Sequence, residues 1–101
     1  MIFQSKQVMS AVEYLLRGMF DSGLVSRVTD AIVVNGQPPG QIQVCFEQGG
    51  FLVKAGGTFD FTVFDSSDVT IAVRICEVVG RIARAARSCV VFLRPASKKS
   101  V

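Results

Sequence analysis

The chain has 101 residues, of which 50% are hydrophobic and 19% charged, with a formal net charge of +3 and a mean hydropathy of +0.43. This length suits one domain with a single core, the composition excludes a disordered chain, and no stretch approaches the ~20 apolar residues of a membrane-spanning helix. The absence of histidine excludes Ser-His and Cys-His nucleophilic sites and His-ligated metals.

The first predicted element is a helix over about residues 6–21. Ser5 is a suitable N-cap, although Ser10 with Glu13 matches a capping box that would start the helix later. Gly23 follows as a stop signal. Apolar side chains recur along this segment at spacings that place them on one helical face: Val8, Val12, Leu15, Leu16 and Met19.

From Val25 the hydrophobic period changes to two, and we expect three or four strands between Val25 and Phe64. Turns that contain glycine or proline separate them at residues 35–40, 48–50 and 56–57. Alternation is clearest over residues 42–47, which predicts a half-buried strand. Because the connections are short, we expect antiparallel pairing.

A second helix is predicted over residues 68–87, with Asp65 as a cap and Asp68 complementing the positive end of the helix dipole. Residues 89–93 are apolar on both faces, which is typical of a central strand, and Pro95 ends it. The element order predicts an α+β fold: a single, mainly antiparallel sheet of four to five strands with two helices packed on one face. We expect one domain over residues 1–95 and a flexible basic tail over 96–101.

Charge is unevenly distributed along the chain. From Arg74 to Val101 there are seven basic residues against one acid, Glu77, whereas the first 73 residues have four basic and seven acidic residues. The net charge of +3 is therefore the sum of +6 over residues 74–101 and −3 over residues 1–73. Much of this positive charge falls on one side of the second predicted helix.

The basic side chains of that helix form a stripe beside Glu77, and two interpretations of it remain open. Cations near the C-terminus stabilise the helix dipole, and Glu77 with Arg81 has the favourable i,i+4 orientation. Alternatively, the stripe binds phosphates or an acidic protein patch, on a surface that Lys98 and Lys99 extend. The candidate partner- or nucleic-acid-binding residues are Arg74, Arg81, Arg84, Arg87 and Arg94.

The same helix has a ridge of small residues, which would let another backbone approach closely. A sheet covers only part of a helix, so we expect this ridge to contact either the first helix or a second copy of the chain. The residues of this helix-packing or dimer contact are Ala72, Cys76, Gly80 and Ala83.

Motifs of catalysis and metal binding are missing. Cys45, Cys76 and Cys89 are scattered, and no phosphate-binding loop occurs, so we expect no enzymatic activity, cofactor or metal site. Three cysteines without an N-terminal export signal are typical of a cytoplasmic protein.

These features favour a small, non-enzymatic protein-binding module that acts stoichiometrically and forms a homodimer. We expect no interaction with a membrane. An assembly adaptor, or an inhibitor of a host complex of the kind that mobile elements encode, fits this description, with a partner that has an acidic surface. The alternative is a nucleic-acid-binding domain that uses the arginine stripe of helix 68–87.

Overall fold

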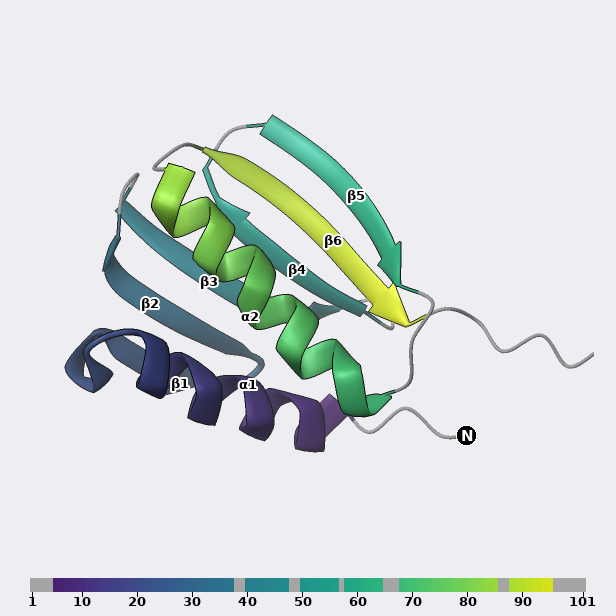
Figure 1. The fold of residues 1–101 in the computed structure, drawn as a ribbon, viewed down its shortest axis with the longest axis horizontal. Coiled ribbons are helices and arrows are strands. Elements are labelled where there is room, and N and C mark those ends of the chain that lie inside the picture. Colours follow the sequence, from purple (N-terminus) through teal and green to yellow (C-terminus); the bar gives the residue numbers. More distant parts are fainter. Residues whose placement is uncertain are drawn as a thin grey trace, which may run out of the picture.

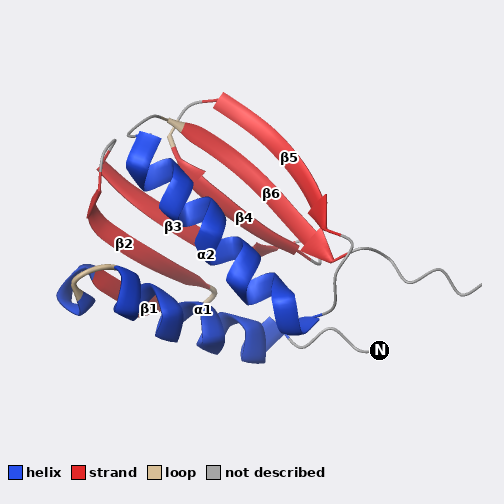
Figure 2. Ribbon diagram, viewed as in Figure 1, coloured by secondary structure: helices blue, strands red, loops and turns tan. Residues whose placement is uncertain are grey.

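The computed structural model describes residues 5–37, 40–47, 50–56, 58–64, 68–85 and 88–95; at Ser5, Gln37 and residues 58–64, 68–70 and 94–95 it describes the backbone alone. Figure 1 shows two neighbouring helices on one face of a twisted sheet, and Figure 2 shows the same two layers by element type. The predicted α+β class, with both helices on one face, is confirmed. The predicted tail, residues 96–101, lies outside the described residues.

The elements follow one another as α1 (Ser5–Met19), the 3-10 turn η1 (Ser22–Leu24), β1 (Val25–Val28), β2 (Ala31–Gln37), β3 (Gly40–Glu47), β4 (Gly50–Ala55), β5 (Thr58–Phe64), α2 (Asp68–Ala85) and β6 (Cys89–Pro95). The helix α1 stops at Met19, two residues before the predicted end. The Asp21 side chain accepts a hydrogen bond from the Gly23 backbone at 3.2 Å and caps η1, which turns the chain toward β1.

The strands lie in the order β1-β2-β3-β4-β6-β5, so the sheet has six strands, one more than expected. The additional strand arises because a two-residue turn at 29–30 divides the segment from Val25 into β1 and β2, which pair antiparallel from Val28 opposite Ala31. Four neighbouring pairs are antiparallel, and β5 with β6 is parallel. A parallel pair needs a crossover connection, which α2 supplies. The last strand has neighbours on both sides, as its apolar sequence predicts.

The core lies between the helices and the sheet. In the register, Ile32 is opposite Val44, Val44 opposite Val53, and Val53 opposite Val91, and all four side chains are buried. Because paired residues share a face, this is the face that the helices cover. Contacts divide this face, with α1 over β1 and β2 and α2 over β4 and β6.

Neither of the described helices lies over the opposite face of the sheet (Figure 1). On this face, Val33 is opposite Gln43, Cys45 is opposite Leu52, and the exposed Lys54 is opposite Val90; apart from Lys54, these side chains are half-buried. We call Val33, Cys45, Leu52, Lys54 and Val90 the open face. Toward the C-terminal end of β2, this side of the sheet becomes polar: the Gln41 side-chain amide donates to the Asn35 side-chain oxygen across the strands, and the Gln43 amide donates to the Gln41 side-chain oxygen along β3.

Candidate functional site

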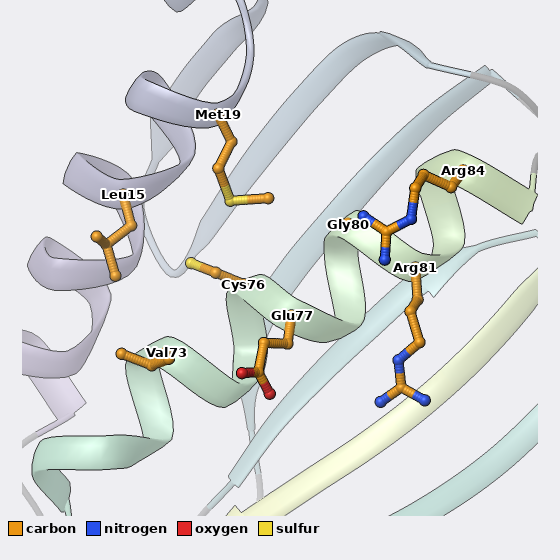
Figure 3. Close-up of a pocket in the computed structure, with 8 residues that line it drawn as sticks. All are labelled: Leu15, Met19, Val73, Cys76, Glu77, Gly80, Arg81 and Arg84. Atoms are coloured by element: carbon orange, nitrogen blue, oxygen red, sulfur yellow. The ribbon is translucent and has the colours of Figure 1, made fainter.

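A groove with a volume of about 630 Å³ lies between α1 and α2 (Figure 3). Figure 3 shows Leu15 and Met19 pointing from α1 toward α2, and the thiol of Cys76 pointing back toward α1. Most of its lining is apolar, although charged side chains of α2 lie along one edge. The lining residues are Leu15, Met19, Val73, Cys76, Glu77, Gly80, Arg81 and Arg84.

Small residues of α2 allow the two helices to approach closely along the floor of the groove. The Cys76 sulfur lies 4.0 Å from the carbonyl oxygen of Val12, and a Cβ added to Gly80 would lie 3.3 Å from the Met19 methyl carbon. The later residue of α1, Met19, contacts the later residue of α2, Gly80. The two helices therefore run in the same direction, as Figure 1 also shows. The absent side chain of Gly80 therefore both permits the contact and deepens the groove.

Two apolar side chains are strongly exposed in this groove. Val73 is 50% exposed and Met19 is 46% exposed, and the half-buried Leu15 lines the groove with them. Single exposed apolar residues are normal on a protein surface, and Tyr14 and Val28 are examples outside the groove. Apolar residues that share one concave surface beside charged groups are instead typical of a binding site.

The arginines at the edge of the groove have no ion partner among the described residues. The described ion pairs join Glu13 to Arg17 and to Arg27, and neither Arg81 nor Arg84 takes part in one. The favourable i,i+4 orientation of Glu77 and Arg81 thus does not produce an ion pair in this structure. Figure 3 shows both of these side chains pointing away from α1, whereas the Arg84 guanidinium turns back toward Gly80.

The remaining predicted arginines lie elsewhere or outside the described residues. Arg74 is exposed on α2 but does not line the groove. Arg87 lies outside the described residues, and of Arg94 only the backbone, within β6, is described. The groove therefore brings together two of the five predicted binding residues.

The middle of the predicted small ridge, Cys76 and Gly80, lies against α1. Ala72 and Cys76 are 4% and 5% exposed, Gly80 is buried, and Ala83 is half-buried against the core. Of the two contacts that the sequence leaves open for this ridge, the structure shows the one with the first helix at Cys76 and Gly80.

Residues on the α1 side of the groove were not predicted as binding residues, and neither was Val73. On a helical wheel, Val73 falls in the same arc as Gly80 and Arg84, seven and eleven residues further on. An apolar residue inside a charged arc is a signal that the sequence contains. The α1 contribution of Leu15 and Met19 has no such signal, because both belong to a regular apolar face.

The chemistry of the described residues suits binding. Burial raises the pKa of the Cys76 thiol to about 11, so this sulfur stays protonated and unreactive at neutral pH. Within the described ranges, no three His, Cys, Asp or Glu side chains gather as metal ligands would, and no helix is long and apolar enough to cross a membrane.

The chain was compared with known proteins by family, by sequence and by structure. No protein-family model matches it, and no curated protein or solved structure matches it either. A functional interpretation therefore depends on the groove, its exposed apolar side chains and its two arginines.

Proposed function

We propose that this protein is a non-enzymatic binding module that acts stoichiometrically, as an adaptor or inhibitor, on a protein partner with an acidic surface. The observation that carries the proposal is the coincidence, in one groove, of exposed apolar side chains with two arginines that have no ion partner among the described residues. We place the protein in the cytoplasm, where its three free thiols would remain reduced.

The apolar and the charged parts of the groove would have different roles. Fully burying a large apolar side chain stabilises a complex by about 1.5–3 kcal/mol, so covering the exposed halves of Val73 and Met19 would contribute about 1 kcal/mol each. An exposed ion pair contributes about 0.2–1 kcal/mol. The apolar contacts would therefore supply most of the affinity, and Arg81 and Arg84 would select an acidic partner and speed its association.

A protein partner fits this surface better than nucleic acid does. A surface for phosphates would be mainly cationic, because affinity for nucleic acid comes largely from neutralised phosphates. The groove is instead mainly apolar, and Glu77 is one of its lining residues.

The test is the double variant Arg81→Gln/Arg84→Gln, assayed against the protein that co-purifies with the tagged parent. We expect a loss of affinity of about two- to thirtyfold, with the fold retained because both side chains are exposed and glutamine is a good helix former. Arg74→Gln is the matched control, since Arg74 is exposed on the same helix outside the groove.

Undiminished partner binding by the double variant would contradict the proposal. Binding of the parent to random duplex DNA at micromolar concentration and physiological salt, abolished in the double variant, would support the nucleic-acid alternative instead.

A further inference from the structure

We infer that the groove binds a single amphipathic helix of the partner, about three turns long, with an acidic residue facing Arg84. This inference rests on the proposed function and names the structural element that the groove would recognise. It follows from the length of the groove, from the elements that form its walls and from the placement of its charges.

The length of the groove matches a short helix. Its α2 wall extends from Val73 to Arg84, twelve residues that together rise by about 16 Å, or three helical turns. On the opposite wall, Leu15 and Met19 lie one turn apart. A helix that lies in this groove would present apolar residues at positions i, i+4 and i+7 to the exposed apolar side chains of both walls.

The walls of the groove favour a helix over an extended strand. A bound strand gains affinity from hydrogen bonds to unpaired backbone groups at a sheet edge. Here both walls are α-helices, whose interior backbone groups are paired within each helix. A helix satisfies its own backbone and needs only side-chain contacts from these walls.

The charges of the groove define where the bound helix would have its acidic residue. Arg84 stands near Gly80 at one end, and Glu77 lies two turns before it along α2 (Figure 3). An acidic residue of the partner would be favoured beside Arg84 and disfavoured beside Glu77. Arg81, which points away from α1, would attract acidic residues on the flank of the bound helix.

The experiment is a selection of displayed random peptides of 16 residues against the whole chain, with counter-selection against Val73→Glu. We expect the enriched peptides to have the i, i+4, i+7 apolar pattern and an acidic residue. Circular dichroism should show that these peptides become helical when they bind. Their affinity should fall about tenfold for Val73→Glu and up to about fivefold for Arg84→Gln, and should rise for Glu77→Gln.

Two controls and a second groove variant make the result decisive. Arg74→Gln and Tyr14→Ser change exposed residues outside the groove and should leave the affinity unchanged. Met19→Gln changes a half-exposed groove residue and should weaken binding even if Val73→Glu disturbs the fold. Peptides that bind in an extended form, that are basic, or that bind the groove variants equally well would overturn the inference, and so would the absence of any enriched peptide.

The two proposals fail in different ways. If the selection overturns the helix while Arg81→Gln/Arg84→Gln still loses the co-purifying partner, protein binding stands and the helix is wrong. If a fatty acid competes with the peptides but no protein partner depends on the arginines, the groove is a small-molecule site and the proposed function fails.

Discussion

Glu13 joins α1 to β1 through its two carboxylate oxygens. One oxygen accepts hydrogen bonds from Arg17 within α1, the shorter at 3.0 Å, and the other accepts one from Arg27 of β1 at 3.1 Å. Arg17 also donates to the Ser22 carbonyl oxygen of η1 at 3.0 Å. The hydrogen bond from Arg17 is the main cause that lowers the pKa of the Glu13 carboxyl below 4.5, with Arg27 contributing against the opposing effect of burial.

Replacing Glu13 by glutamine should destabilise the fold by about 1 kcal/mol at pH 7, because two partly exposed ion pairs are lost. Because the pKa of Glu13 is lowered in the folded state, its charged carboxylate stabilises the fold fully above pH 4.5. This stabilisation is lost as the pH falls through the pKa of Glu13 in the folded protein. Urea unfolding should therefore show that the free energy of unfolding falls less between pH 7 and pH 3 for Glu13→Gln than for the parent. Glu77→Gln, which removes no described ion pair, is the control; an equal acid-induced loss in all three proteins would contradict this role for Glu13.

The cysteines should differ in reactivity according to their burial. Cys45, half-buried on the open face, should react with a maleimide under native conditions much faster than Cys76, which is 5% exposed. Burial raises the pKa of both thiols, and that of Cys76 reaches about 11. Because the pKa of Cys76 is raised in the folded state, the neutral thiol contributes its full stability below pH 9, and this contribution is lost as the pH rises through 11. Cys76→Ala should therefore remove part of any loss of stability at alkaline pH. Mass spectrometry of partially labelled protein measures the order, and earlier labelling of Cys76 would contradict the burial of this helix face.

At the scale of elements, the contact between α1 and α2 depends on Gly80. The Cβ of any other residue would lie 3.3 Å from the Met19 methyl carbon and 3.4 Å from an Arg84 nitrogen, both at the ends of flexible side chains. Gly80→Ala should therefore be tolerated, with a gain in helix propensity of up to about 1 kcal/mol. A larger side chain would fill the groove and displace α1.

Gly80→Leu should destabilise the protein by about 1–3 kcal/mol through overpacking between the helices. Gly18→Leu is the matched control, because a Cβ at Gly18 of α1 has nothing within 4 Å and should be neutral or stabilising. Thermal and urea unfolding of both variants measure the difference. Equal stability of Gly80→Leu and the parent would show that α1 and α2 separate easily.

At the scale of the whole molecule, the helices cover one side of the sheet and leave the open face to solvent. Of its five residues, Lys54 alone is charged, and the others are half-buried. A two-layer fold leaves such a face as the natural surface for self-association, which would also account for the high mean hydropathy of +0.43.

We expect a homodimer in sedimentation at micromolar concentration, formed through the open face. Leu52→Lys, which adds a charge at the middle of this face, should shift the dimer to a monomer with little loss of fold. Val73→Glu, in the groove on the other side of the sheet, should leave the dimer intact. A monomeric parent would contradict self-association, and a dimer that Leu52→Lys leaves unchanged would place the contact elsewhere.

The sequence by itself determined the kinds of element, their order and the α+β class. These depend on local patterns: the helical spacing from Val8 to Met19, the alternation over residues 42–47, and the glycine turns between short strands. The small ridge of α2 was also visible, because a run of small residues at helical spacing needs no knowledge of its contact. Of the groove, the sequence indicated Arg81 and Arg84, which belong to one charged arc.

The tertiary structure alone decided how these elements meet. The insertion of β6 between β4 and β5 depends on which strands pair across the α2 crossover. The pairing of Glu13 with Arg27, and the junction of Leu15 and Met19 with Val73, likewise join residues distant in the sequence. Such contacts form because the whole chain buries its apolar surface at once, and periodicity within one segment carries no information about the segment that will cover it.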